Sequence, residues 1–300
     1  MFRHKMGLYE RKALMSAAGS KKYEGLTPLL KRIFIGTAIF EVAGAALLSI
    51  RFCRDYGGIG VYYALWHSVS AFCNAGFDLV GIGGTSLSAY ATDPLVSLTV
   101  CALIIMGGLG FCVWGDVIDA KCRLKKMQLN TKVVLFVSVL LLVLSTGLYL
   151  LFEWKNPSYS GYNFWQKLLC SFFNATTTRT AGFFTTDPAT LSDSGYLLTL
   201  ILMFIGGSSG STAGGIKVGT FAVLIMGMFG VFRGHRDINI GSKKRIDYSL
   251  LSQALAIFAA CLMMVLLSTL VICAIEPNKD IFTEVLYECV SAMGTVGFCL

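Results

Sequence analysis

The sequence predicts an all-α integral membrane protein in which a module of span, re-entrant pore half helix, filter loop and span is repeated around a pore. Three observations predict this fold class. Hydrophobic residues make up 55% of the 300 residues and charged residues only 14%, a composition typical of membrane proteins. A degenerate motif ending in Gly-Phe occurs three times. Long apolar runs, the expected spans, occupy residues 33–50, 95–113, 133–152, 196–205 (resuming at 218) and 250–275.

The repeated motif carries a small or hydroxyl residue six places before its glycine, and it occupies residues 70–77, 176–183 and 291–298. The three glycines lie too far apart for a solenoid repeat, whereas their spacing suits a membrane module. A short apolar stretch precedes each motif, at residues 61–72, 164–174 and 281–293. These stretches are too short to cross a bilayer, so each is predicted to be a re-entrant half helix.

The distribution of Lys and Arg predicts the orientation in the membrane. These cations gather in residues 1–32, 119–132 and 233–247, and the other segments between spans are short and poor in cations. By the positive-inside rule the three basic segments are cytoplasmic, so the half helices enter from outside. The net charge of +8 is thereby explained as a topology signal, and no nucleic acid partner is expected.

The expected domain organisation follows the chain. It consists of a cytoplasmic basic segment (1–32), a pore module (33–118), a cytoplasmic loop (119–132), a pore module with an intramembrane loop (133–232), a second cytoplasmic loop (233–247) and an incomplete pore module (248–300). Asp93 with Pro94, and Asp187 with Pro188, are predicted to begin the return spans. The run from Gly107 to Gly110 is expected to allow close approach of another helix.

Polar side chains inside the apolar segments have two interpretations each. Glu41 in the first span is expected to make a packing hydrogen bond, with a role in an ion path as the alternative. His67 on the first half helix is expected to pack or to bond a neighbouring backbone group, with a proton relay as the alternative. The ten cysteines are scattered, most of them in apolar stretches, and are interpreted as small membrane hydrophobes.

A run of small residues interrupts the return part of the second module. Irregular backbone at membrane depth is tolerated only beside water or when buried in protein, so this loop is a candidate gate. A phosphate-binding loop is excluded because Ile216 separates the last glycine from Lys217 and no strand precedes it. The candidate gate residues are Gly206, Gly207, Ser208, Ser209, Gly210, Ser211, Thr212, Ala213, Gly214, Gly215 and Lys217.

The three glycine motifs suit a cation pore. A potassium ion must exchange its water shell for oxygens, which rings of backbone carbonyls can supply. Glycine adopts the unusual dihedral angles that turn carbonyls toward an axis at the least steric cost. Half helices that enter from outside also bring their partly negative C-terminal ends to the membrane centre. The alternative is that the Gly-Phe pairs only pack.

These motifs resemble those of the superfamily of potassium transporters that includes the bacterial Ktr and Trk translocating subunits and plant HKT proteins, and most resemble the Ktr membrane subunit. The matching stretches are F-C-N-A-G-F-D, R-T-A-G-F, G-G-S-S-G-S-T-A-G-G-I-K and S-A-M-G-T-V-G-F. That family arranges four modules around one pore. The resemblance implies that the motifs here are the second, third and fourth filters, with the gating loop in the third module. It assigns filter roles to Asn74, Ala75, Gly76, Phe77, Thr180, Ala181, Gly182, Phe183, Thr295, Val296, Gly297 and Phe298.

The resemblance implies potassium uptake, with sodium or proton coupling left open, and no enzymatic activity. It further implies a multi-pass chain of the bacterial plasma membrane, in contact with lipid, that forms a homodimer. A cytoplasmic nucleotide-binding regulatory subunit of the KtrA or TrkA type is the implied partner, and no cofactor is expected in this chain.

Relative to the family, the sequence lacks the first module and the last return span, so it is expected to be a fragment. A truncated, non-transporting product and a re-entrant-loop transporter of another solute are the alternatives. Arg179 and Lys217 could act electrostatically on the pore or make structural pairs.

Overall fold

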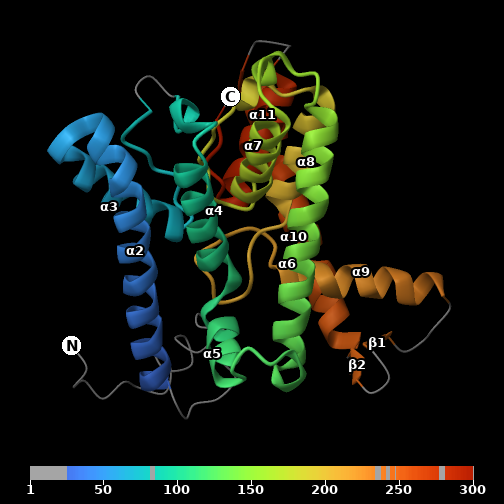
Figure 1. The fold of residues 1–300 in the computed structure, drawn as a ribbon. Coiled ribbons are helices and arrows are strands. Elements are labelled where there is room, and N and C mark those ends of the chain that lie inside the picture. The colour runs from blue at the N-terminus through green and yellow to red at the C-terminus, as the bar shows by residue number, and fades with distance from the viewer. Residues whose placement is uncertain are drawn as a thin grey trace.

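The computed structural model describes residues 26–81, 85–233, 238–240, 244–246, 248–276 and 281–299, which are mainly helical (Figure 1). The α-helices and strands are α2 (Leu26–Tyr56), α3 (Gly60–Phe72), α4 (Pro94–Leu109), α5 (Phe111–Asp119), α6 (Leu129–Phe152), α7 (Phe164–Thr177), α8 (Asp193–Phe204), α9 (Val218–Phe232), β1 (Ile238–Ile240), β2 (Lys244–Ile246), α10 (Tyr248–Ile275) and α11 (Phe282–Gly294). Short 3-10 turns are η1 (Gly57–Ile59), η2 (Ser88–Tyr90), η3 (Leu124–Lys126), η4 (Pro157–Tyr159) and η5 (Pro188–Thr190).

Three long helices, α2, α6 and α10, are apolar and long enough to cross a membrane. Each is followed by a short helix that packs back against it, so that α3 lies on α2, α7 on α6 and α11 on α10. These short helices have 13, 14 and 13 residues, which is less than a bilayer requires. The predicted pairing of a span with a half helix is therefore confirmed in all three repeats.

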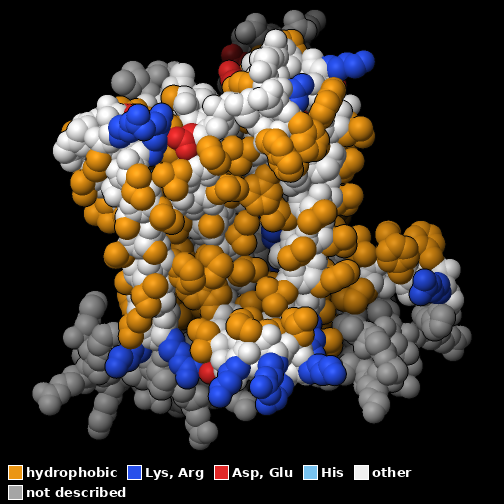
Figure 2. Space-filling model, viewed as in Figure 1, with side chains coloured by type: hydrophobic (Ala, Val, Ile, Leu, Met, Phe, Trp, Pro, Cys, Tyr) orange, Lys and Arg blue, Asp and Glu red, His pale blue; other side chains and the backbone are white. Residues whose placement is uncertain are grey.

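The surface of the described chain suits a membrane. Large hydrophobic side chains are exposed along the long helices, among them Phe136, Val143 and Leu151 of α6. Figure 2 shows these orange side chains covering the flanks, with Lys and Arg gathered along the lower edge. Exposing so much apolar surface to water would cost free energy, whereas contact with lipid acyl chains avoids that cost. Cys101, Cys170 and Cys289 are buried as free thiols in the described part of the chain.

The prediction of one continuous span over residues 95–113 is wrong. Helix α4 ends at Leu109, Gly110 has a φ of 91°, and α5 turns away by 89°. The cause is a segment distant in sequence, because the amide of Phe111 donates to Gly210 O at 2.8 Å instead of continuing the helix. Gly107 allows the close approach of the end of α3, as predicted, because a Cβ atom there would clash with Phe72 O. Gly110 allows the close approach of the loop, because a Cβ atom there would be 2.8 Å from Ser209 O.

The return part of the second module also differs from expectation. Asp187 does not begin a span: it accepts a hydrogen bond from the amide of Ala189 and caps η5. Helix α8 begins later, with Ser192 as its cap. In the first module, the prediction that Asp93 and Pro94 begin a helix is confirmed. Asp93 caps α4 by accepting a hydrogen bond from the amide of Leu95 at 2.9 Å. Figure 1 shows α9 projecting sideways from the bundle after the irregular loop.

Candidate functional site

The three glycine motifs form loops that leave the C-terminal ends of α3, α7 and α11. In each loop the glycine has a positive φ: 73° at Gly76, 78° at Gly182 and 89° at Gly297. The residue two places earlier is left-handed as well, at 51° in Asn74, 75° in Thr180 and 54° in Thr295. Alternating backbone handedness turns successive peptide groups to one side of the chain. The same unusual conformation in all three loops argues against simple packing of Gly-Phe pairs.

The loops lie against one another in sequence order. A Cβ atom on Gly76 would be 2.4 Å from the carbonyl oxygen of Ala181, and one on Gly182 would be 2.3 Å from that of Val296. Each of these glycines therefore faces a carbonyl of the next loop, at a distance that no side chain tolerates. The arrangement brings main-chain oxygens of different modules to one place.

The ring of loops is open between the third and the first. A Cβ atom on Gly297 would meet nothing within 4 Å among the described residues. On the other side of the gap, Phe77 is 69% exposed, whereas Phe183 and Phe298 are buried. Phe183 packs into the preceding module, with its ring centre 6.1 Å from that of His67. Phe77 has no preceding module among the described residues on which to pack.

A side chain of the half helix holds the carbonyl that follows each glycine. In the third loop Ser291 Oγ donates to Phe298 O at 2.9 Å, and in the second Thr177 Oγ1 donates to Phe183 O. In the first loop the donor is Trp66 Nε1, 3.2 Å from Phe77 O. The sequence motif pointed to a hydroxyl at one fixed place, and so it missed the last two donors.

His67 anchors the first loop. Its side chain is fully buried, Nδ1 donates to Tyr63 O at 2.7 Å and Nε2 accepts from the amide of Leu79 at 3.4 Å. Because a carbonyl can only accept, the proton is assigned to Nδ1. The expected bonds to neighbouring backbone are confirmed. Glu41 is half-buried, and its main-chain carbonyl accepts from Ser68 Oγ at 2.6 Å, which ties α2 to α3.

The run of small residues between α8 and α9 is an irregular loop, as predicted, and its two ends are tied together. The amide of Gly206 donates to Ile216 O at 3.0 Å, and the amide of Val218 donates to Gly207 O at 2.9 Å. Lys217 Nζ donates to Ala213 O at 2.6 Å within the same loop. Lys217 therefore makes a structural pair with a carbonyl.

The middle of this loop rests on α4. The amides of Ser208 and Thr212 donate to Gly108 O at 2.9 Å and to Gly107 O at 3.2 Å. The loop thereby supplies α4 with the hydrogen-bond donors that a continued helix would have provided.

The loop also lies against the first and third glycine loops. Thr212 Oγ1 is 3.0 Å from Phe72 O and 3.3 Å from Asn74 Oδ1. On the other side, a Cβ atom on Gly214 would be 1.9 Å from Thr295 Oγ1. The small residues of this loop thus pack directly against the ends of two half helices, α3 and α11.

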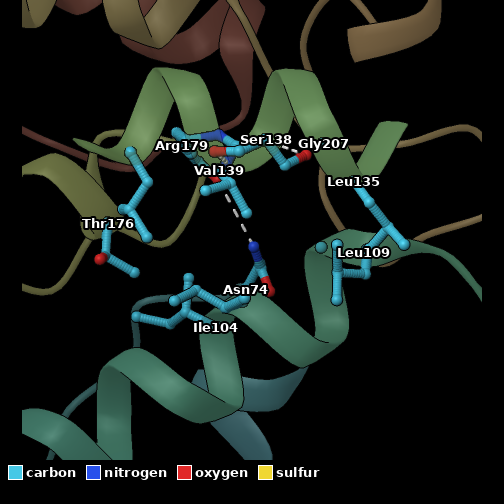
Figure 3. Close-up of a pocket in the computed structure, with 12 residues that line it drawn as sticks. Asn74, Ile104, Leu109, Leu135, Ser138, Val139, Thr176, Arg179 and Gly207 are labelled. Carbon is cyan, nitrogen blue, oxygen red and sulfur yellow. Dashed lines mark hydrogen bonds between the residues drawn. The ribbon is translucent and has the colours of Figure 1, made fainter. Parts of the chain in front are cut away.

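Arg179 lies behind the second loop, beside a cavity of about 120 Å³. Its Nη1 and Nη2 are 3.5 and 3.4 Å from the carbonyl and hydroxyl oxygens of Ser138 on α6, and its buried Nε has no partner in the described part of the chain. Across the cavity, Asn74 Nδ2 is 3.5 Å from Arg179 O (Figure 3). The guanidinium thus pairs with oxygens of its own module's span, while Asn74 joins two glycine loops to the gate candidate.

Glu153 is a buried carboxylate that the sequence analysis missed. It follows α6, is fully buried, and accepts hydrogen bonds from the amide and hydroxyl of Ser192 at 3.1 and 2.6 Å and from Asn156 Nδ2. These bonds fix the start of α8 against the end of α6. An acidic residue at the end of an apolar run, followed by a polar segment, is the only sequence signal for this role.

Comparisons with known proteins agree with one another. The family model described as "TrkH: Cation transport protein" matches residues 1–300. The chain is 35% identical over 299 residues to the potassium/sodium uptake protein NtpJ of Enterococcus hirae, covering 99% of this chain and 65% of that protein. It is also 35% identical over 298 residues to the Ktr system potassium uptake protein B of Bacillus subtilis, again covering 99% and 65%. This chain therefore spans about 65% of the length of these relatives.

Among solved structures, the fold is similar to the crystal structure of the potassium transporter TrkH from Vibrio parahaemolyticus, with a TM-score of 0.70. That match covers 96% of this chain and 66% of the other, at 17% sequence identity, so it bears on the fold alone.

Proposed function

The chain belongs to the TrkH family of cation transport proteins, which are transporters and not enzymes, and from this premise we propose that it is the channel-like part of a potassium uptake protein. The names of the two curated relatives support potassium as the transported ion. The observation that carries the proposal is the contact of Gly76 and Gly182 with carbonyl oxygens of the following loops. Such converging oxygens replace the water shell of a potassium ion.

The proposed filter consists of the glycine loops, and its residues have two tasks. The glycines provide the positive φ and the space for the next loop's carbonyl, as the geometry of Gly182 illustrates. Phe183, which follows the second glycine, packs against His67 of the preceding module and holds its loop in place. The filter residues proposed are Asn74, Ala75, Gly76, Phe77, Thr180, Ala181, Gly182, Phe183, Thr295, Val296, Gly297 and Phe298.

The proposed gate is the irregular loop of residues 206–217. Its hydrogen bonds from Thr212 toward Phe72 and Asn74 hold it directly under the filter. An ion leaving the filter can pass only when these contacts are released. The loop is tied at both ends through Gly206 and Val218, so its middle can move while its ends stay fixed.

We also propose that a further module closes the filter in the working protein. Gly297 and Phe77 on either side of the opening lack the contacts that their counterparts make with a neighbouring loop or module among the described residues, and the curated relatives are longer than this chain. A filter open on one side would admit water and lose selectivity. A non-transporting, truncated product is therefore the second candidate.

The finer assignments of place and partner belong to the same proposal. A homodimer in the bacterial plasma membrane would present its basic loops to a cytoplasmic nucleotide-binding subunit. In the described part of the chain, the loop between α5 and α6 exposes Lys121, Arg123, Lys125 and Lys126 for that contact.

The test is rescue of potassium-limited growth in a bacterial strain that lacks its own potassium uptake systems. The 300-residue chain is compared with a version extended by the missing parts of a curated relative. Rescue by the extended version alone, lost on Gly182→Asp, supports the proposal. The matched control is Gly161→Asp, at an outer-loop glycine that also has a positive φ of 83°, and a Cβ atom there meets none of the described residues within 4 Å.

Two results would count against the proposal. Rescue by the 300-residue chain alone would show that an open ring conducts. No rescue by either version, with both present in the membrane, would indicate another solute.

A further inference from the structure

A cavity of about 550 Å³ opens at the lower part of the first module, between α2, α5 and the start of α6. Its walls are apolar and come from α2, α4, α5 and α6, with Ile39, Phe40, Met106, Phe111 and Leu135 among them. A volume of this size greatly exceeds the roughly 30 Å³ of one water molecule. Its apolar walls offer water few hydrogen-bond partners, so an apolar group fills this space at a lower free energy than water does.

The cavity lies in the half of the membrane that faces the cytoplasm by the positive-inside rule. Arg32 lines its mouth and forms an exposed ion pair with Asp119, the Nη1 to Oδ1 distance being 3.0 Å. Lys31 and Lys126 are exposed neighbours of lining residues, and Asp116 is the other acidic group on α5. Figure 2 shows the resulting predominance of basic side chains along this edge.

Trp114 places an aromatic side chain in the wall of the cavity. Its ring centre lies 5.0 Å from that of Phe40, another lining residue. An acyl chain in the cavity would therefore contact this ring, and the fluorescence of Trp114 can report it.

We propose that this cavity binds one acyl chain of an anionic phospholipid from the cytoplasmic leaflet. The chain fills the apolar space, and the basic rim around Arg32 holds the headgroup. Each basic side chain near a membrane surface contributes a roughly fivefold preference for anionic lipid. Lipid binding does not rest on the proposed transport function, and it can be measured without transport.

The proposed lipid site lies beside the break between α4 and α5, to which the loop of residues 206–217 is hydrogen-bonded. Met106, Leu109 and Phe111 line the cavity, and the amide of Phe111 donates to Gly210 O in that loop at 2.8 Å. A bound acyl chain therefore contacts residues on both sides of the break between α4 and α5, Leu109 and Phe111.

The experiment is quenching of Trp114 fluorescence by brominated lipids in vesicles that hold the full chain. Two vesicle sets contain phosphatidylglycerol and phosphatidylcholine in equal amounts, with bromine on the acyl chains of one lipid or of the other. The fluorescence of Trp114 is obtained by subtracting the fluorescence of the Trp114→Phe variant from that of the unsubstituted protein. We expect at least about fivefold stronger association of the brominated anionic lipid with Trp114.

Substitutions locate the site. A Cβ atom on Gly115, which lines the cavity, meets no described residue within 4 Å, so Gly115→Phe should fill the space and abolish the quenching. Gly147→Phe on the exposed face of α6, where a Cβ atom also meets none of the described residues, is the matched control and should leave the quenching unchanged. Arg32→Gln should reduce the preference for anionic lipid while quenching persists.

Three outcomes would overturn the proposal. Equal quenching by both brominated lipids would show that the site has no preference for the anionic headgroup. No quenching of Trp114 by either lipid shows that protein fills the cavity, from this chain or from a second copy. Quenching that survives Gly115→Phe places the acyl chain elsewhere.

Discussion

The hydroxyl of Thr212 is predicted to hold the loop of residues 206–217 closed, and Thr212→Val tests this with almost no change of shape. Thr212 Oγ1 has one proton and two acceptors, Phe72 O at 3.0 Å and Asn74 Oδ1 at 3.3 Å. The substitution therefore removes the equivalent of one hydrogen bond, about 0.5 to 1.5 kcal/mol net. Since about 1.4 kcal/mol is a factor of ten in an equilibrium constant, the open population should rise roughly two- to tenfold.

Hydrogen exchange of the loop measures this change directly. The amides of Ser208 and Thr212 are protected by their bonds to α4, and they exchange only when the loop leaves it. Their exchange should accelerate by the same two- to tenfold factor. Ser211→Ala is the control, because Ser211 Oγ donates to Ser208 O at 2.6 Å inside the loop. Unchanged exchange in Thr212→Val, or equal acceleration in the control, would refute the reasoning.

Three further predictions concern stability, measured as the midpoint of thermal unfolding in detergent. Gly182→Ala should destabilise the chain by about 1 to 3 kcal/mol more than Gly297→Ala. Both glycines have a positive φ, but among the described residues only Gly182 faces a carbonyl. Equal unfolding midpoints for the two variants would contradict this. Glu153→Gln should cost about 1 to 3 kcal/mol, since the amide cannot replace a carboxylate that accepts several hydrogen bonds; an unchanged midpoint would rule out that role. Gly110→Ala, with φ at 91°, should cost about 1 to 2 kcal/mol, while Gly115→Ala inside α5 should be neutral or stabilising.

Much of the fold was predictable because it is local. The spans and half helices follow from the length of their apolar runs, and the repeated motif aligns the three modules. The irregular loop follows from its composition, since ten consecutive small residues favour no regular helix at membrane depth.

The errors arose where a distant segment decides a local conformation. Residues 95–113 are apolar whether the helix is straight or bent, so hydropathy does not reveal the break at Gly110. The break depends on hydrogen bonds such as that from Phe111 to Gly210. The pair Asp187 and Pro188 has the composition of a helix N-terminus, yet Asp187 caps only the short turn η5. Helix α8 begins later, after Ser192, because Ser192 is held by Glu153.

The site shows the same division. The glycine positions were predictable from the repeat, as were the small residues beside them. The donors Trp66 and Thr177, and the position of Asn74 between two loops and Thr212, depend on how modules meet in space. The roles of these residues in ion passage stay predictions.

The bend between α4 and α5 has a consequence for biosynthesis. A chain is made from its N-terminus, so α4 and α5 leave the ribosome well before the loop that supplies Gly210 and Thr212. Until that loop arrives, the backbone groups around Gly110 have no such partners, and the apolar segment is best satisfied in lipid as one straight helix. We therefore expect the 89° turn to form only when the following module docks against α4.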